Sequence, residues 1–391
     1  MRPRLFLGVL VLVFAATFTF ASGLHLEPEK DELHFLRSSE GFRGAFDLEA
    51  LRSYKELVTP LALVIWGELD HVTGDGLYYG RLLNLVLAFA MVCLVAFCAP
   101  KDWPRGALAA LGLLLFPYTL PLGVHLYTDT LGVFLVVAGT LAVARSRPLT
   151  AFAAFSLAIA TRQYAIQIPA ALAAAEGVAW LRGERERWKA VAACTAGCAT
   201  LLGWVAFYGG LANAAGIEDW VPYYPAPMMT AREFVLHQGL YALAGLGMFF
   251  VAIEAALFQR NPLGGLRSAR GAALALALAG LFWLDPPVLN ASFPGGPLGR
   301  VSLLVLPAPD LDGARVALYY ALALLALGRF TLRIDEGFWL AAAAFLLATK
   351  QQLPWEKYLY PTLAVLWTLV SLGRLAPSAV RPPAADPART D

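Results

Sequence analysis

Long apolar stretches recur along almost the whole chain, and short polar segments separate them. They predict membrane spans at Leu5–Ser22, Leu77–Cys98, Gly106–Leu122, Asp129–Ala144, Leu149–Thr161, Ala165–Leu181, Val191–Leu211, Leu236–Phe258, Gly271–Leu284, Ala314–Leu327, Gly337–Thr349 and Tyr358–Leu372. A straight span needs about 20 apolar residues, so the shorter stretches predict tilted, shortened or re-entrant segments. The pattern therefore predicts an all-α, polytopic bundle of about 12 transmembrane helices.

One segment, residues 24–81, breaks this pattern. It is rich in charged and polar side chains, including Asp31, Glu32, His34, Arg37, Glu40, Arg43, Asp47, Glu49, Arg52, Lys55, Glu56, Glu68, Asp70, His71, Asp75 and Arg81. Lipid cannot solvate so many charges, so the segment must lie in water or in a water-filled cavity. Within it, Leu57–Leu69 is apolar but short and contains Pro60, which favours an interfacial helix over a span.

The composition excludes an ordinary soluble protein. Hydrophobic residues make up 59% of the 391 residues and charged residues only 15%, and the mean hydropathy is +0.62. A soluble domain would carry about a quarter charged residues. The net charge of +2 and the lack of a basic run argue against a nucleic-acid partner. The 34 glycines suit close packing of helices in lipid.

No sequence motif for a metal or a cofactor is present. The four cysteines, Cys93, Cys98, Cys194 and Cys198, lie inside apolar runs, where cysteine behaves as a small hydrophobic residue. Neither Cys-x-x-Cys nor His-Glu-x-x-His spacing occurs. We therefore expect no cofactor, and a requirement for a divalent metal stays open.

The basic residues predict the orientation. With the N-terminus in the cytoplasm and an uncleaved first span, more than half of the 30 Lys and Arg residues fall in inner loops. Every inner loop then carries at least two, as the positive-inside rule requires. We expect a multi-pass domain over residues 1–375 and a disordered cytoplasmic tail over 376–391. Segment 24–81 then forms the long first outer loop. A bacterial or archaeal plasma membrane is expected, or the endoplasmic reticulum in a eukaryote.

Several polar groups at the predicted outer ends of the spans are candidates for a functional site. They are Tyr127, Asp129, Arg162, Gln163, Arg300, Lys350 and Lys357. Lone Lys and Arg residues at span ends commonly anchor a helix at the interface. The set is harder to explain in this way, because acidic residues gather in the first loop while short outer turns supply cations.

This distribution suits the transfer of a sugar from a lipid phosphate. Cations would bind the phosphate and stabilise it as it leaves, and a carboxylate would deprotonate the attacking hydroxyl. Such a donor lies in the membrane, which would explain why most of the chain is apolar. The expected partners are a polyprenyl-phosphate-linked sugar, a glycan or lipid-linked acceptor, and membrane lipids.

Several short motifs appear in the order in which a known family carries them. They are Glu27-Pro28-x-x-Asp31-Glu32, Thr59-Pro60-Leu61, Arg81-x-x-Asn84-Leu85, Phe116-Pro117, Tyr127-Thr128-Asp129, Arg162-Gln163 and Glu356-Lys357-Tyr358. The chain thereby resembles the dolichyl-phosphate-glucose α-1,2-glucosyltransferases of N-glycan precursor assembly, which belong to the GT-C superfamily. The likeness covers about residues 25–180, with a weaker match at 350–362. Lys357 stands where the family has Arg, and a later His-Pro and Asp-Asn-Arg-His-Tyr run is missing, so the sugar and the acceptor stay open.

The resemblance implies a GT-C-like fold and an inverting transfer with an acidic base in the first outer loop, and glucose is the sugar that the family transfers. Asp31 and Glu32 are the candidate catalytic residues. If the segment is helical, Asp31 and His34 share a face while Glu32 points elsewhere, which favours Asp31 as the base. Arg162 and Lys357, followed by Arg300 and Lys350, are the candidate phosphate ligands. The candidate substrate contacts are His34, Arg81, Tyr127, Asp129 and Gln163.

Two other classes of protein remain compatible with the sequence. A secondary transporter or lipid flippase could also have twelve spans. It should place charges near the midplane of broken helices and show repeat symmetry, whereas here the charges lie at the outer ends. A structural or partner-binding membrane subunit is the third possibility.

Overall fold

The computed structural model describes residues 3–19, 27–28, 30–44, 47–220, 234–259, 261–287, 296–331, 333–350 and 356–375. These residues form helices and connecting turns, with no strand among them. The first half contains α1 (Pro3–Thr17), α2 (Lys30–Glu40), α3 (Leu48–Ser53), α4 (Leu61–Thr73), α5 (Gly76–Phe97), η2 (Pro100–Asp102), α6 (Trp103–Leu114), α7 (Thr119–Val124), α8 (Thr128–Ala144), α9 (Pro148–Thr161), η3 (Gln163–Ile166), α10 (Gln167–Leu181), η4 (Arg185–Arg187) and α11 (Trp188–Tyr208).

The second half is also helical. It contains α12 (Ala214–Trp220), α14 (Leu236–Leu246), η5 (Gly247–Ala252), α15 (Ile253–Phe258), η6 (Gly264–Arg267), α16 (Ala269–Leu284), α17 (Pro297–Val305), η7 (Pro309–Leu311), α18 (Asp312–Phe330), α19 (Glu336–Ala348), η8 (Glu356–Leu359) and α20 (Tyr360–Ser371). The expected tail, 376–391, lies outside the described residues.

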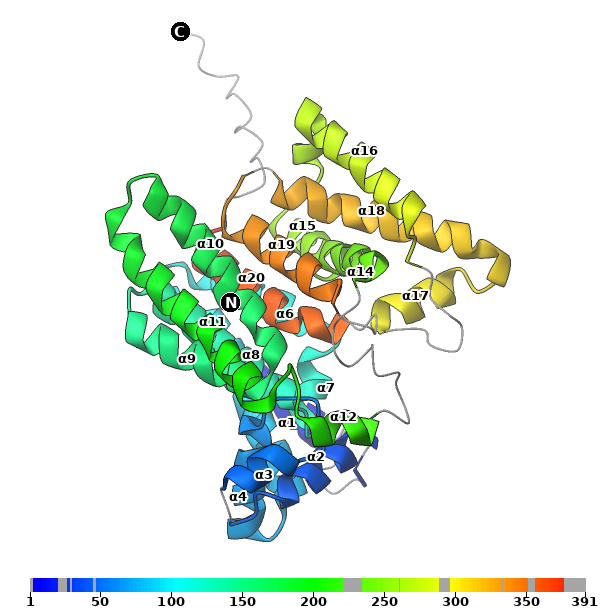
Figure 1. Ribbon diagram of the computed structural model, residues 1–391. Coiled ribbons are helices and arrows are strands. Elements are labelled where there is room, and N and C mark those ends of the chain that lie inside the picture. Colours follow the sequence, from blue (N-terminus) through cyan, green and yellow to red (C-terminus); the bar gives the residue numbers. More distant parts are fainter. Residues whose placement is uncertain are drawn as a thin grey trace.

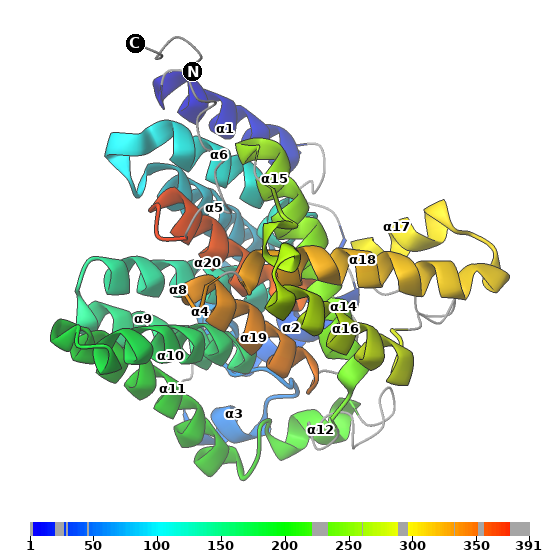
Figure 2. The same ribbon diagram turned by 90° about the horizontal axis from the view of Figure 1, so that it is seen from above.

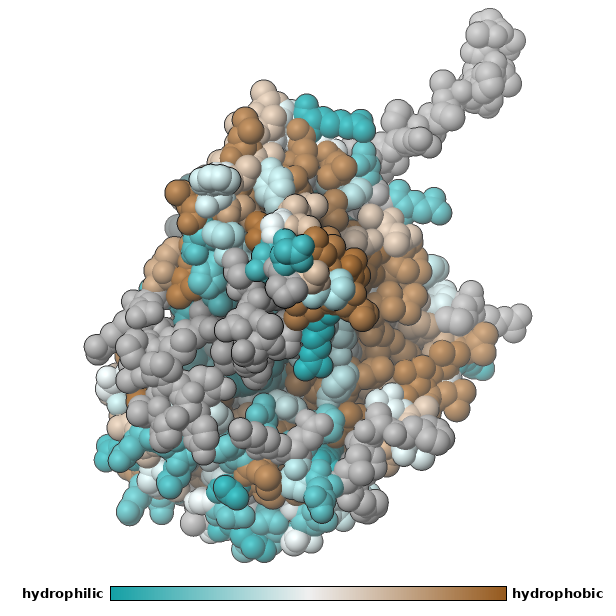
Figure 3. Space-filling model, turned by 90° about the vertical axis from the view of Figure 1, so that its right-hand side faces the viewer, coloured by the Kyte–Doolittle hydropathy of each residue, from teal (hydrophilic) through white to brown (hydrophobic). Residues whose placement is uncertain are grey.

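The apolar helices make this a membrane-embedded protein. Five helical segments of the described chain are long and apolar enough to cross a bilayer: Gly76–Phe97, Gln163–Leu181, Arg185–Tyr208, Leu236–Phe258 and Asp312–Phe330. Five shorter apolar helices accompany them: α1, α8, α9, α16 and α19. The space-filling view shows a broad apolar surface on one side of the molecule, with hydrophilic side chains gathered toward the lower end (Figure 3).

Helix α20 is the centre of the bundle. Each of its residues, Tyr360–Ser371, is buried, and it packs against α6, α8, α10 and α19. Helices α8, α9, α10 and α11 lie on one side of it, and α14, α16, α18 and α19 lie on the other (Figures 1 and 2). Twelve residues would be short for a straight span, but a helix enclosed by protein does not have to match the thickness of the lipid.

Glycines allow the helices around α20 to approach closely. A side chain on Gly112 of α6 would overlap the ring of Trp367, and one on Gly247 would overlap the backbone of Leu322 in α18. Small residues at such crossings favour helix association in membranes, where packing rather than the hydrophobic effect holds helices together.

Two expected spans differ from regular α-helices. The expected span Gly106–Leu122 is divided into α6 and α7, because Pro117 and Pro121 lack the amide hydrogens that a continuous helix needs. The expected span Leu236–Phe258 is continuous but contains the π-helical segment η5. Most of the other expected spans agree with helices of the structure to within a few residues.

The segment expected as an outer loop folds into helices at one end of the molecule. Helices α2, α3 and α4 lie there together with α12 (Figure 1). A small apolar core of Phe35, Phe42, Tyr54, Leu63 and Trp66 holds them to one another. Helix α4 covers most of Leu57–Leu69, where a helix was expected. This end of the bundle carries the buried charges described next.

Candidate active site

Five ionisable side chains from distant parts of the chain lie close enough to influence one another's charge. Asp31 lies in the first turn of α2, Glu56 follows α3, Asp129 lies in the first turn of α8, Arg162 follows α9 and Lys357 lies in η8. Their charges act on one another: Arg162 and Asp31 act on Glu56, and Asp129, Arg162 and Asp31 act on Lys357. We call this set the charged cluster.

Asp129 and Arg162 form the core of the charged cluster. The guanidinium of Arg162 donates to the Asp129 carboxylate over 2.7 Å, and the Asp129 side chain is fully buried. The Tyr164 hydroxyl donates to the other carboxylate oxygen, and the Arg162 guanidinium lies 5.3 Å from the Tyr164 ring centre. A buried ion pair with this additional hydrogen bond fixes the orientation of the guanidinium.

Hydrogen bonds to other parts of the chain hold the loop around Glu56 in place. The Gln163 side chain donates to the carbonyl of Leu57 over 2.8 Å, and the Thr59 hydroxyl donates to the carbonyl of Ile159 over 2.6 Å. The Asn213 amide donates to the Glu56 carbonyl over 3.3 Å.

Burial raises the pKa of the Glu56 carboxyl to about 8, against the opposing charge of Arg162. Glu56 is therefore mostly protonated at neutral pH and can donate a hydrogen bond.

Lys357 is a buried cation between aromatic rings. Its ammonium lies 5.6 Å from the ring centres of Tyr127 and Tyr358. Burial lowers its pKa to about 8, and the carboxylate of Asp129 opposes that effect. The side chain thus keeps most of its charge at neutral pH, in a site from which water is largely excluded.

The adjacent acids of α2 have different surroundings. The Glu32 carboxylate is fully buried, and Arg81 donates to it twice, over 2.9 and 2.5 Å. It also accepts from the Leu126 amide over 2.6 Å. The Asp31 side chain stays partly accessible and accepts from the Tyr127 hydroxyl over 3.3 Å. Glu32 therefore joins α2 to α5 through Arg81, while Asp31 lies near the other members of the charged cluster.

Several buried polar atoms near the charged cluster have no hydrogen-bond partner among the described residues. They are Glu56 Oε1, Arg162 Nε, Thr128 Oγ1 and Glu356 Oε2. Leaving a buried donor or acceptor unpaired costs about 1–3 kcal/mol. So many unpaired atoms in one region are typical of a site that a polar ligand or ordered water completes.

Glu356 closes one side of this region. Its Oε1 accepts from the Tyr241 hydroxyl over 2.6 Å and from the Leu298 amide over 2.8 Å. A side chain on Gly296 would overlap Glu356 Oε2 and approach the Tyr118 hydroxyl. The carboxylate thereby fastens the start of α17 to the bundle beside Lys357.

The structure separates the residues expected from the sequence into three groups. Asp31, Tyr127, Asp129, Arg162 and Lys357 lie together. Arg81, Glu32 and Gln163 make the fastening contacts described above. The remaining three lie outside the charged cluster: Arg300 and Lys350 are exposed, and the His34 ring lies 4.8 Å from that of Trp220.

Sequence reasoning missed Glu56, Tyr164 and the role of Glu356. Glu56 is one of many charges in segment 24–81, and its only distinguishing signal is the apolar Leu57-Val58 that follows it. Tyr164 directly follows Arg162-Gln163, so its position next to a buried cation could have been suspected.

The described residues contain no group of three His, Cys, Asp or Glu side chains that could hold a metal ion. Comparison with protein-family models, with curated proteins and with solved structures finds no match to this chain.

Proposed function

We propose that this protein is a membrane-embedded inverting glycosyltransferase of GT-C type. It moves a sugar, with glucose as the first candidate, from a polyprenyl-phosphate or dolichyl-phosphate donor to a lipid-linked glycan or another acceptor. The reaction takes place at the end of the bundle that carries α2, α3, α4 and α12. Under this proposal, that end faces the outer or lumenal side of the membrane.

The main support for the proposal is that buried cations lie near both buried acids and an acid that is partly exposed. Lys357 and Arg162, whose charge Asp129 partly balances, lie near a partly accessible carboxylate, Asp31. A phosphate needs such cations to bind and to leave, and a hydroxyl acceptor needs a carboxylate to take its proton. The unpaired Arg162 Nε leaves one donor of the guanidinium for a ligand.

The chemical step follows from this arrangement. The acceptor hydroxyl oxygen attacks the anomeric carbon of the sugar from the side opposite the phosphate, so the configuration inverts. The bond between that carbon and the phosphate oxygen breaks, and the electron pair leaves with the polyprenyl phosphate. Asp31 takes the proton of the hydroxyl, and its negative charge favours the oxocarbenium-like transition state.

Asp31 suits the base role better than Glu32. Both oxygens of Glu32 are engaged by Arg81, so a proton added there would break a buried ion pair. Protonated Glu56 would serve as a hydrogen-bond donor to a sugar or phosphate oxygen. Tyr127, which donates to Asp31, would hold the base in place.

The order of the apolar helices supports a twelve-span topology. If α6 with α7, and α14 with α15, each count as one span, then α1, α5, α8, α9, α10, α11, α16, α18, α19 and α20 complete twelve crossings. All members of the charged cluster then fall on the same side, and the loops rich in Lys and Arg fall on the other.

Incubation of the purified protein with a polyprenyl-phosphate sugar and candidate acceptors tests the proposal. An enzyme releases polyprenyl phosphate and forms a new glycoside. A transporter or flippase leaves the donor intact and only moves it between leaflets in reconstituted vesicles. Intact donor with every acceptor tried, combined with leaflet exchange of the donor, would replace the proposal with transport.

A further inference from the structure

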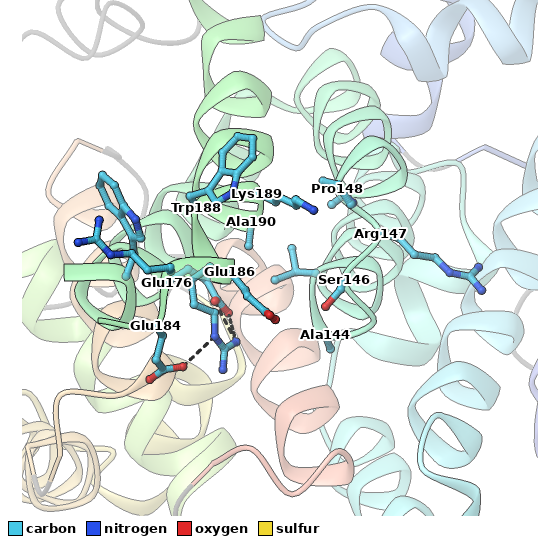
Figure 4. Close-up of a pocket in the computed structure, with 15 residues that line it drawn as sticks. Ala144, Ser146, Arg147, Pro148, Glu176, Glu184, Glu186, Trp188, Lys189 and Ala190 are labelled. Atoms are coloured by element: carbon cyan, nitrogen blue, oxygen red, sulfur yellow. Dashed lines mark hydrogen bonds and ion pairs between the residues drawn. The ribbon is translucent and has the colours of Figure 1, made fainter. Parts of the chain in front are cut away.

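A second polar site lies at the opposite end of the bundle. Asp129 is in the first turn of α8 and Ala144 ends that helix, so about 22 Å of helix separates the two positions. A cavity of about 1220 Å³ opens beyond Ala144, between the turn before α9 and the turn before α11 (Figure 4). This volume exceeds the 300–1,000 Å³ of common ligand pockets. We call it the basal cavity.

Three cations of the basal cavity are available to a ligand. Arg147, Arg185 and Lys189 line it, are exposed and form no ion pair with the described residues. A fourth cation, Arg187, is already engaged: it bonds to the buried Glu176 over 3.0 Å and to Glu184 over 3.0 Å (Figure 4). The available charge is therefore positive.

The carboxylates of the basal cavity reduce this charge without cancelling it. Glu176 is paired with Arg374 as well as Arg187, over 2.8 Å and 3.0 Å. Glu184 is paired with Arg187. Glu186 forms no ion pair with the described residues and therefore opposes an anion in the cavity. Three available cations against one available carboxylate favour an anionic ligand.

Apolar side chains next to the basal cavity place it at the level of the lipid. Trp180 and Trp188 line it and are partly exposed, and their indoles are typical of the boundary between membrane and water. Leu149 and Leu181 lie beside it, with 82% and 79% of their surface exposed. Residues this apolar and this exposed, at the ends of apolar helices, suit contact with acyl chains.

We propose that the basal cavity binds the head group of an anionic phospholipid. Lys189 contacts its phosphate, and Arg147 and Arg185 lie at the rim, where their charge attracts its anionic groups. The tryptophans lie alongside the glycerol and upper acyl region. Basic pockets between transmembrane helices bind anionic head groups in this way. The site is independent of the chemistry at the charged cluster.

Native mass spectrometry of the purified full-length protein, in an uncharged detergent, tests the proposal directly. Phosphatidylglycerol and phosphatidylcholine with the same acyl chains are each titrated, and the protein-bound lipid is counted. We expect phosphatidylglycerol to be retained at much lower concentration. The double variant Arg147→Gln/Lys189→Gln should lose about tenfold or more in apparent affinity, since each cation near the membrane surface contributes roughly fivefold.

Two further variants fix the sign and the position of the effect. Glu186→Gln removes the opposing carboxylate and should tighten phosphatidylglycerol binding. Lys101→Gln/Arg270→Gln removes two exposed cations that do not line the cavity and should bind like the wild type. If Lys101→Gln/Arg270→Gln lost as much affinity for phosphatidylglycerol as Arg147→Gln/Lys189→Gln, net charge alone would explain the loss. That result would overturn the proposal.

Three other outcomes would also overturn it. The first is equal retention of the two lipids by the wild type. The second is wild-type binding by Arg147→Gln/Lys189→Gln. The third is displacement of phosphatidylglycerol by inorganic phosphate at equal concentration, which would make the ligand a soluble anion. A cavity variant that fails to fold would be replaced by Lys189→Gln alone, for which about a fivefold loss is expected.

Discussion

Glu56 shows how far the surroundings of one side chain change its chemistry. In water its carboxyl would be ionised at neutral pH, but burial raises its pKa to about 8. The same burial lowers the pKa of the Lys357 ammonium to about 8. Desolvation thus brings the pKa values of a carboxyl group and an ammonium group close to each other and close to neutral pH.

The raised pKa of Glu56 makes stability depend on pH. Between pH 4.5 and about 8 the folded protein keeps a proton that the unfolded chain releases, so stability falls as pH rises through this window. The slope is at most ~1.4 kcal/mol per pH unit. Glu56→Gln has no carboxyl to titrate and so loses this pH dependence. The difference in melting temperature, variant minus wild type, should therefore increase from pH 5 to pH 8. A difference that stays constant with pH would contradict this, and exposed Glu49→Gln is the control.

Lys357 is expected to bind the donor phosphate. Lys357→Gln removes one charged contact, which should weaken transition-state binding by about 1.5–3 kcal/mol and raise the donor KM or lower kcat accordingly. Steady-state kinetics with a polyprenyl-phosphate sugar measure this. Lys55→Gln removes an exposed cation on the same side and should leave the kinetics unchanged. Unchanged donor kinetics in Lys357→Gln would reduce this lysine to a structural cation.

At the scale of the element, the periodic apolar signal was the most informative part of the sequence. The ends of α5, α8 and α9 were predicted within two residues, because each begins or ends at a charge or a proline. The break between α6 and α7 was missed, although Pro117 and Pro121 carried the signal. The burial of α20 was not predictable, because an apolar helix reads the same whether protein or lipid surrounds it.

Close packing at α20 gives a prediction for stability. Gly112→Ala places a methyl group against the ring of Trp367 and should destabilise the protein by about 1–3 kcal/mol. Gly203→Ala in α11 meets open space and should be neutral or slightly stabilising, since alanine favours a helix. Thermal unfolding in detergent compares the two. Equal effects would mean that α6 and α20 are not as close as described.

At the scale of the whole molecule, the sequence predicted where charges gather but not which ones meet. Asp31 was predicted from the charged first loop and the family resemblance, and Asp129, Arg162 and Lys357 from the ends of spans; the four lie near one another. The partners of Glu32 and Arg81 were not predicted, because 49 residues separate them and only the folded bundle joins them. Arg300 and Lys350, which are exposed, shared with buried Lys357 a position at the end of a span, and only the family resemblance ranked Lys357 above them.

Orientation in the membrane can be measured directly. Two cysteine variants, Glu40→Cys and Glu184→Cys, serve as probes. Glu40 lies at the end of the bundle with the charged cluster, Glu184 lines the basal cavity, and both are exposed. In intact cells, an impermeant thiol reagent should label the first and not the second, as the distribution of Lys and Arg requires. The wild type is the control, because its cysteines are buried or half-buried. The reverse pattern would place the charged cluster in the cytoplasm.

The most direct measurement of the central claim is the release of polyprenyl phosphate by Asp31→Asn. The account predicts that the wild type converts a polyprenyl-phosphate sugar and that Asp31→Asn binds the same donor but does not turn it over. Glu32→Gln should instead lower the melting temperature, because it breaks a buried ion pair worth about 3–5 kcal/mol when one partner is removed. Near-normal turnover by Asp31→Asn would contradict the account.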